Sequence, residues 1–229
     1  MADTKIDDIV KSKLPVLCLD TCIILDLLRF PEDCASGVRM HTAARRILRA
    51  VKGQELVILI ADQVSLELDN CLDQTEQKSI KDIEELRSAV NDLEAATAVY
   101  ERQRTSNLDH LDQYVLQARK VIDGYRSLAI PAMSSEHVLR KAYTRMTQAR
   151  TPAHKGKDAI NDCVIIETYL EIAHLVRARG HQKSFVFATS DVNDYGQKPN
   201  PDLRVEFNAV KVEFAPKLSA ARHHLGISA

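Results

Sequence analysis

Three short apolar segments restrict the fold of this chain more than any other feature. The first two lead through a polar residue into a helical pattern, and the third leads into a polar turn. They cover residues 16–19, 55–61 and 184–188. The second, ELVILIA, is apolar on both faces, as strands of parallel sheets are. Because parallel neighbours need crossover connections, which are usually helical, the pattern predicts a three-layer α/β/α fold around a central parallel sheet. Residues 210–214 are a further candidate strand.

The interval between the second and third segments is predicted to be mostly helical. From Thr75 to Gly124 the sequence has no proline and only that closing glycine. Apolar residues recur there at three-and-four spacing: Ile83, Leu86, Val90, Leu93, Tyr100, Leu108, Leu111, Val115, Ala118, Ile122 and Tyr125. We expect one domain over residues 1–229, with a helical insertion at about 73–150 that contains two long antiparallel helices. The same spacing is typical of coiled coils, so homo-oligomerisation through the insertion is an alternative role.

Composition excludes several classes of protein. Hydrophobic residues make up 45% and charged residues 28% of the chain, which is ordinary for a globular domain. The first residues are polar and no apolar run approaches membrane-spanning length, so we expect a cytoplasmic location and no membrane partner. The five cysteines include no Cys-x-x-Cys pair, which favours free thiols in a reducing compartment over disulfides or a zinc site.

Acidic residues lie just after the predicted strands or early in the neighbouring helices. They are Asp20 after the first strand, Glu67 about one turn into the helix after the second, Asp191 and Asp194 after the third, and Asp158 and Asp162 near the start of a helix that leads to the third. The carboxyl ends of parallel strands meet at one edge of a sheet, where α/β proteins place their sites. We therefore expect these carboxylates to converge.

Convergent carboxylates repel one another unless a cation lies between them. Mg²⁺ and Mn²⁺ prefer oxygen ligands, and one or two such ions support hydrolysis of phosphodiester bonds. The sequence has no Gly-x-Ser-x-Gly elbow, no Walker glycine loop and no Gly-x-Gly-x-x-Gly motif, so no competing nucleophile or nucleotide site stands out. The acids thus predict a metal-dependent nuclease.

Each acid taken singly also has an ordinary structural explanation. Asp20 could cap a helix, Glu67 could be a solvated helix residue, and Asp191 with Asp194 could form a turn. Asp20 could also be the phosphorylated acid of a phosphotransfer protein. The second acid of an Asp-x-Asp pair is absent, however, because position 22 is a cysteine.

A basic stretch precedes the helix that carries Asp162. Residues 137–157 contain Arg140, Lys141, Arg145, Arg150, Lys155 and Lys157 and no acidic residue. Lys141 and Arg145 lie one turn apart on a helix capped by Ser134 or Ser135, and residues 151–157 form a loop beside the acids. We expect nucleic acid to contact the basic side chains of Arg140, Lys141, Arg145, Lys155 and Lys157. The alternative is a solvated helix face with a polar loop.

Four segments resemble, in their order and in their placement on strands and helices, the motifs of the PIN-domain nucleases: LCLDTCIILDLL, ILIADQVSLEL, DAINDCVIIETYLEIA and FVFATSDVNDYG. The resemblance spans residues 14 to about 214, interrupted by the helical insertion. It implies a parallel sheet, a Mg²⁺ or Mn²⁺ site, and single-stranded RNA as the commonest substrate. By position, Asp20, Glu67, Asp162 and Asp191 match the family's acidic residues, Asp194 its additional acid and Thr189 its supporting threonine.

The resemblance leaves two points open around these residues. Thr21 and Ser190, which lie next to matched acids, are expected to support the site. Either Asp158 or Asp162 could be the metal ligand, and we favour Asp162 because an apolar helix follows it directly.

The sequence as a whole predicts a metal-dependent endoribonuclease, a hydrolase that binds RNA. In this hypothesis Asp20, Asp162 and Asp191 hold the metal and Glu67 completes the acidic pocket. A non-catalytic PIN-like module that binds a partner through its helices is the alternative. The compact toxins of the family are shorter and lack such an insertion. The resemblance is therefore to the larger bacterial members and argues against an antitoxin partner.

Overall fold

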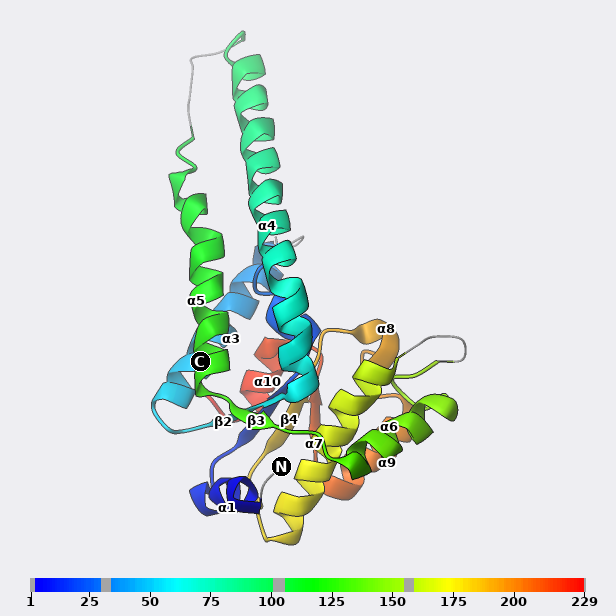
Figure 1. The fold of residues 1–229 in the computed structure, drawn as a ribbon. Coiled ribbons are helices and arrows are strands. Elements are labelled where there is room, and N and C mark those ends of the chain that lie inside the picture. The colour runs from blue at the N-terminus through cyan, green and yellow to red at the C-terminus, as the bar shows by residue number, and fades with distance from the viewer. Residues whose placement is uncertain (1–2, 30–33, 101–105, 155–158, 229) are drawn as a thin grey trace.

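The centre of the fold is a five-stranded sheet in the order β3-β2-β1-β4-β5, in which every neighbouring pair is parallel (Figure 1). The structure, a computed structural model, describes residues 3–29, 34–100, 106–154 and 159–228. The strands are β1 (Val16–Leu19), β2 (Val57–Ala61), β3 (Ile130–Ala132), β4 (Phe185–Ala188) and β5 (Glu213–Ala215). β1 lies in the middle of the sheet, so the residue that follows it lies in the middle of the sheet's carboxyl edge.

Helices cover both faces of the sheet. One face packs against α3 (Cys34–Lys52), α5 (Asp112–Leu128) and α10 (Leu218–His224), and the other against α7 (Ile160–Ala178) and α9 (Pro201–Val210) (Figure 1). Two further helices, α1 (Asp3–Ser12) and α6 (Glu136–Thr147), pack on α7. Every residue of β1 and β4 is buried, as a strand covered on both faces must be. The predicted three-layer α/β/α fold is confirmed.

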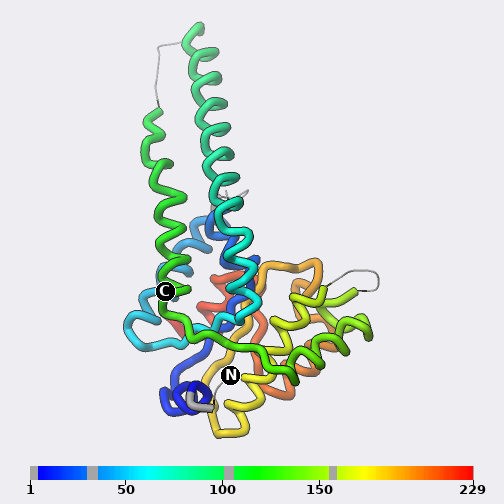
Figure 2. Tube along the Cα trace, viewed as in Figure 1, coloured from blue at the N-terminus to red at the C-terminus, as the bar shows by residue number. Residues whose placement is uncertain are grey.

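A helical arm rises from the carboxyl edge of the sheet (Figure 2). It consists of the 36-residue helix α4 (Asp62–Thr97), the 3₁₀ turn η1 (Asp109–Leu111) and α5. Arginine–carboxylate pairs join the two helices, at 2.5 Å between Arg126 and Asp69, 2.7 Å between Arg119 and Glu76, and 2.6 Å between Arg87 and Asp112. Later residues of α4 pair with earlier residues of α5, so the helices are antiparallel, as the periodicity predicts.

The sequence missed or misplaced two strands. β3 falls within residues 73–150, expected to form a helical insertion, yet Leu59 to Ala61 of β2 pair with it along the sheet edge. Its three residues include Pro131, which an edge strand tolerates because one side of the strand needs no hydrogen bonds. β5 begins at Glu213, beyond much of the interval 210–214 expected for it, because α9 continues to Val210.

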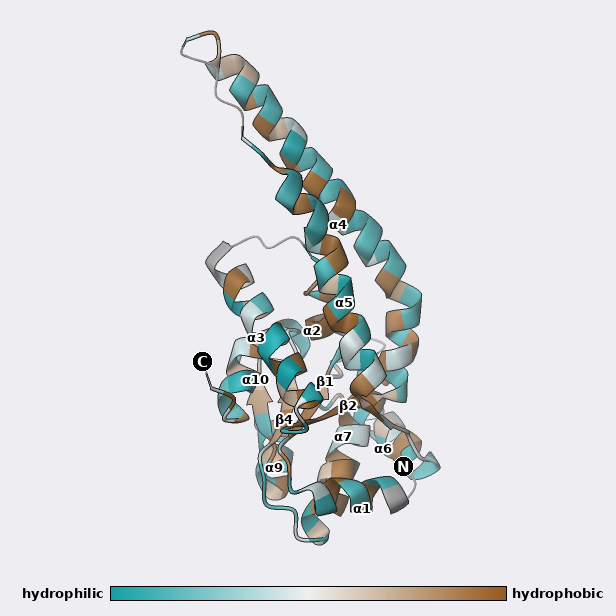
Figure 3. Ribbon diagram, turned by 90° about the vertical axis from the view of Figure 1, so that its left-hand side faces the viewer, coloured by the Kyte–Doolittle hydropathy of each residue, from teal (hydrophilic) through white to brown (hydrophobic). Residues whose placement is uncertain are grey.

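Tyr169 of α7 fixes the carboxyl edge of the sheet where the candidate site lies. Its hydroxyl donates to the carbonyl of Leu19 at 2.6 Å and accepts from the amide of Ala61 at 2.9 Å. It therefore ties the ends of β1 and β2, where two short connections lead into helices. Figure 3 shows the hydrophobic residues concentrated around the sheet, while much of the outer part of α4 is hydrophilic. Among the described residues, no helix has the length and apolar character needed to cross a membrane.

Candidate metal and nucleic-acid site

Asp20 lies at the end of β1 and begins the short helix α2 (Thr21–Leu25). Its Oδ1 accepts from the backbone amide of Thr21 at 2.8 Å, so the carboxylate caps the helix as well as facing the site. Its Oδ2 accepts from the hydroxyl of Thr189 at 2.6 Å and from the thiol of Cys22 at 3.2 Å. The side chain is only 4% exposed, so these three donors hold a buried carboxylate in one orientation.

Burial raises the pKa of the Asp20 carboxyl above its usual range. The hydrogen bonds from Thr189, Cys22 and Thr21 lower this pKa, and the negative charge of Glu67 raises it further. The ionised form of Asp20 is therefore costly in this position, and a cation bound beside it would offset that cost.

Glu67 lies on α4 and is linked to Asp20 through Thr21. The hydroxyl of Thr21 donates to Oε2 of Glu67 at 2.5 Å, while the amide of the same threonine binds Asp20. Oε1 of Glu67 has a long contact, 3.4 Å, with the side-chain amide of Gln63. One threonine thus holds two neighbouring acids, one at the start of α2 and one on α4.

Asp191 and Asp194 lie at the two ends of the first turn of α8 (Val192–Tyr195), after β4. Oδ1 of Asp191 accepts from the amides of Asn193 at 3.1 Å and Asp194 at 3.0 Å, so Asp191 caps this helix. The amide of Asp191 donates to the hydroxyl of Thr189 at 3.1 Å. Thr189 therefore connects Asp20 on one strand with the turn that carries Asp191.

Asp194 is more enclosed than Asp191. It is 5% exposed, and its Oδ1 lies 3.6 Å from Nε2 of His154. His154, which precedes α7, therefore lies beside this part of the site.

Asp162 lies in the first turn of α7. Its charge and the charge of Asp20 both act on the buried side chain of Tyr195. Burial raises the pKa of the Tyr195 hydroxyl, and the charges of Asp20 and Asp162 raise it further. The hydroxyl of Tyr195 has no hydrogen-bond partner within the described part of the chain. Asp20 and Asp162 therefore both lie within electrostatic range of this buried tyrosine. Asp158, the alternative ligand, and the loop lysines Lys155 and Lys157 lie outside the described residues.

Cys22 contacts Asp20, although the sequence predicted no more than a free thiol at this position. Its sulfur lies 3.1 Å from the hydroxyl of Thr189 and accepts from the amide of Ser190 at 3.3 Å, in addition to its contact with Asp20. Burial, followed by the charge of Asp20, raises the pKa of the thiol to about 12. Position 22 is two residues after Asp20 at a strand end, and that spacing was the available signal.

The basic residues expected to contact nucleic acid differ in their exposure to solvent. Arg140 is exposed, and Lys141 is partly exposed and pairs with Glu171 at 2.9 Å. Arg145 is 1% exposed, so the expectation of a solvent-facing guanidinium is wrong. It lies on the buried stripe of α6 together with Val138 and Ala142, which precede it by seven and three residues.

Arg145 has a structural set of partners instead. It donates to Glu167 at 2.7 Å, to Glu206 at 2.7 Å and to the carbonyl of Thr151 at 2.6 Å. These bonds join α6, α7, α9 and the loop that leads toward Asp162. Ser135, one of the two expected caps, begins α6 by accepting from the amide of Val138 at 3.2 Å.

The carboxylate oxygens at the carboxyl edge of the sheet are the type of ligand that a hard divalent cation binds. The carboxylates offer oxygen ligands, which Mg²⁺ and Mn²⁺ prefer. Within the described ranges, no three His, Cys, Asp or Glu side chains are grouped closely enough to hold an ion by themselves. Mg²⁺ commonly keeps several waters and uses one or two carboxylates together with substrate phosphates, so such a preassembled group is not required.

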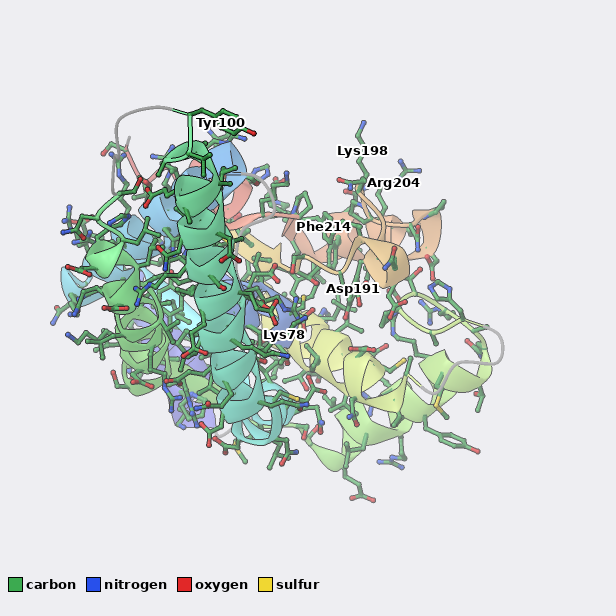
Figure 4. The ribbon with its side chains drawn as sticks, turned by 90° about the horizontal axis from the view of Figure 1, so that it is seen from above. Lys78, Tyr100, Asp191, Lys198, Arg204 and Phe214 are labelled. Carbon is green, nitrogen blue, oxygen red and sulfur yellow. The ribbon has the colours of Figure 1, made fainter. Side chains whose placement is uncertain are left out.

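Viewed from above, Asp191 lies between the side of α4 that carries Lys78 and the region around Lys198 and Arg204 (Figure 4). In this view, positively charged side chains are therefore seen on both sides of Asp191. This arrangement suits a polyanionic ligand that approaches carboxylates.

Comparison with known proteins agrees with the motifs and the fold. A family model described as a PIN domain matches residues 17–195, which includes the first three segments and the fourth as far as Tyr195. No curated protein and no solved structure matches the chain. PIN domains are generally nucleases. Because the match covers most of the chain, the chain belongs to the PIN-domain family of nuclease-type proteins.

Proposed function

We propose that this protein is a divalent-metal-dependent endoribonuclease that hydrolyses phosphodiester bonds of single-stranded RNA. The observation that carries the proposal is the pair of threonine links at the sheet edge. Thr21 connects Asp20 with Glu67, and Thr189 connects Asp20 with the turn of Asp191. Threonine hydroxyls that orient buried acids are expected where those acids have a precise task, since buried carboxylates are otherwise costly.

The residues proposed to hold Mg²⁺ or Mn²⁺ are Asp20, Asp162 and Asp191, with Asp194 and Asp158 as further ligands. When bound, the cation would supply positive charge that polarises the phosphate and lowers the pKa of water. Thr189 would keep Oδ2 of Asp20 in place through its 2.6 Å hydrogen bond, and Ser190 would keep Cys22 in place beside it.

Glu67 is proposed to complete the acidic pocket and to receive a proton. Thr21 occupies Oε2 at 2.5 Å, whereas within the described part of the chain Oε1 has only the 3.4 Å contact with Gln63. Oε1 is therefore the oxygen best placed to accept a hydrogen bond from an attacking water. Arg140 and Lys141 at the surface would contribute charge to substrate binding, together with Lys155 and Lys157.

The test is cleavage of end-labelled single-stranded RNA by the purified protein with Mn²⁺ or Mg²⁺. Asp20→Asn should lower kcat/KM by about 10²-fold or more, because it removes a charged site group while keeping the side chain's shape. The matched control is Asp8→Asn, the same change at an exposed acid of α1, which should leave cleavage unchanged. A wild-type protein that binds RNA and leaves it intact with either metal, or an Asp20→Asn protein of full activity, contradicts the proposal.

A non-catalytic partner-binding role for the arm is the second candidate. Leu93 is 65% and Tyr100 87% exposed near the outer end of α4, where apolar side chains of this size suggest contact with another surface. Association with a second copy predicts that Leu93→Glu lowers the apparent mass in size-exclusion chromatography. If the wild-type protein elutes as a monomer over its whole concentration range, homo-oligomerisation is wrong.

A further inference from the structure

Helix α4 begins beside the acidic pocket and extends far beyond it, and three of its polar residues lie on the same side of the helix as Glu67. Gln74, Lys78 and Lys81 follow Glu67 by seven, eleven and fourteen residues. At 3.6 residues per turn, these positions point within roughly 40° of the direction of Glu67. All three side chains are exposed. Between Gln74 and Lys81, the side of the arm that faces the pocket is therefore polar and carries the positive charge of two lysines.

The opposite side of α4 faces α5. Asp69, Glu76 and Arg87 lie roughly 180° to 200° from Glu67 around the helix. These are the residues that pair with Arg126, Arg119 and Asp112 of α5. The α5-facing acids are thus neutralised within the arm, and their charge does not cancel that of the lysines on the other side.

A hollow of about 780 Å³ lies along the pocket-facing side of α4. Its lining includes Arg29, Gln74, Gln77, Lys78, Lys81 and Asp82. Three of these are cations and two are amides, and among the described residues that line this hollow Asp82 is the only acid. Such a surface can bind phosphates through the cations and sugars or bases through the amides.

Few acidic side chains compete with phosphate for Lys78 and Lys81. Lys78 has no ion pair within the described part of the chain. Lys81 lies 3.5 Å from Glu85, but the two side chains are 74% and 66% exposed, and exposed pairs of this kind contribute little. In Figure 4, Lys78 lies on the side of α4 toward Asp191.

We propose that this side of the arm, which we call the arm track (Arg29, Gln74, Gln77, Lys78 and Lys81), binds the phosphodiester backbone of single-stranded nucleic acid away from the cut. The proposal rests on the nuclease function proposed above. At 1.5 Å per residue, Lys78 lies about 16 Å and Lys81 about 21 Å along the helix from Glu67. At 3.4 Å per stacked nucleotide, this corresponds to about five or six nucleotides from the scissile bond.

The test compares a short with a long RNA. In an oligonucleotide of about four nucleotides the strand is too short to reach from the scissile bond to Lys78, whereas one of about 20 nucleotides spans the arm track. Lys78→Ala/Lys81→Ala should weaken binding of the long RNA by about tenfold in fluorescence anisotropy and leave the short RNA unaffected. The dependence of log affinity on log salt should become shallower by about 1.4, since each lost contact with a single strand contributes about 0.7.

Cleavage provides a second readout. For the long RNA the double variant should raise KM and leave kcat unchanged, because it removes binding far from the reacting atoms. The control is Lys52→Ala/Lys120→Ala, which removes two exposed lysines of α3 and α5 and should alter neither affinity nor salt dependence. Equal unfolding temperatures of the variants exclude a folding defect.

The outcomes separate this inference from the proposed function. If the wild-type protein cleaves RNA and the arm-track variant keeps wild-type affinity and salt dependence for the long RNA, the arm track is wrong and the nuclease stands. Equal loss with the short and the long RNA also overturns the arm track, since the lysines would then act within the pocket itself. No cleavage of either RNA by the wild-type protein contradicts the proposed function, whatever the lysines do.

Discussion

Arg145→Met should destabilise the fold strongly, although this arginine lies in the most basic stretch of the sequence. The guanidinium is 1% exposed and donates to Glu167, Glu206 and the carbonyl of Thr151 at 2.6 to 2.7 Å. Its removal leaves Glu167, whose side chain is 9% exposed, as a buried charge with no cationic partner among the described residues. Breaking a buried pair from one side costs about 3–5 kcal/mol, partly because the remaining charge is desolvated.

Urea unfolding followed by circular dichroism measures this loss. For a chain of this size the same free energy lowers Tm by roughly 6–20 °C. Adding Glu167→Gln to Arg145→Met should recover about 1–2 kcal/mol, because the stranded charge is removed. The control is Arg140→Met, the same change on an exposed position of α6, which should stay within about 0.5 kcal/mol of wild type. A loss below about 1 kcal/mol for Arg145→Met, or a double variant less stable than the single one, refutes this account of the buried network.

Three further perturbations test other parts of the structure. Burial lowers the pKa of His41, so as the pH falls below about 6.5 this histidine is protonated in the unfolded chain before it is protonated in the folded one. The free energy of unfolding should therefore decrease toward pH 5, and it should decrease less steeply in His41→Gln. Equal slopes of unfolding free energy against pH in the two proteins contradict this. With its pKa at about 12, the Cys22 thiol should react with iodoacetamide far more slowly at pH 8 than the exposed Cys71. The rate of labelling at each cysteine is measured by mass spectrometry, and equal rates would contradict the burial of Cys22. Tyr169→Phe leaves the carbonyl of Leu19 and the amide of Ala61 without their partner and should cost about 1–3 kcal/mol in urea unfolding; a cost near zero argues against the link between β1 and β2.

The central part of the fold could be predicted because its strands have a strong local signal. Residues 16–19, 57–61 and 185–188 are short apolar runs, and each leads directly into a helix or a polar turn. Such runs are typical of strands covered on both faces. The two long helices of the arm were predictable for a similar reason, since their apolar spacing extends over many turns.

The edge strands gave no such signal. β3 has the sequence Ile-Pro-Ala, and its strand geometry comes from pairing with β2 rather than from its own composition. The start of β5 depends on where α9 ends. Lys211 has a positive φ of 54° after this helix, a left-handed ending that the sequence marks with no glycine or asparagine.

The candidate site was partly predictable for the same physical reason. Asp20 and Asp191 follow strands whose carboxyl ends must meet, so their convergence follows from topology. Arg145 and Cys22 could not be assigned in this way. The burial of Arg145 depends on Glu167 and Glu206 of two other helices, and the contacts of Cys22 depend on Thr189 and Ser190 of a distant strand.

Manganese binding to the RNA-free protein, measured by isothermal titration calorimetry, tests the central claim that acids from distant parts of the chain share a cation. The wild-type protein should bind Mn²⁺, and Asp20→Asn/Asp191→Asn should weaken this binding by at least about tenfold while the fold stays intact. Asp7→Asn/Asp8→Asn, which removes two exposed acids of α1, should bind as the wild type does. Equal Mn²⁺ affinity in the wild-type and Asp20→Asn/Asp191→Asn proteins would contradict the claim.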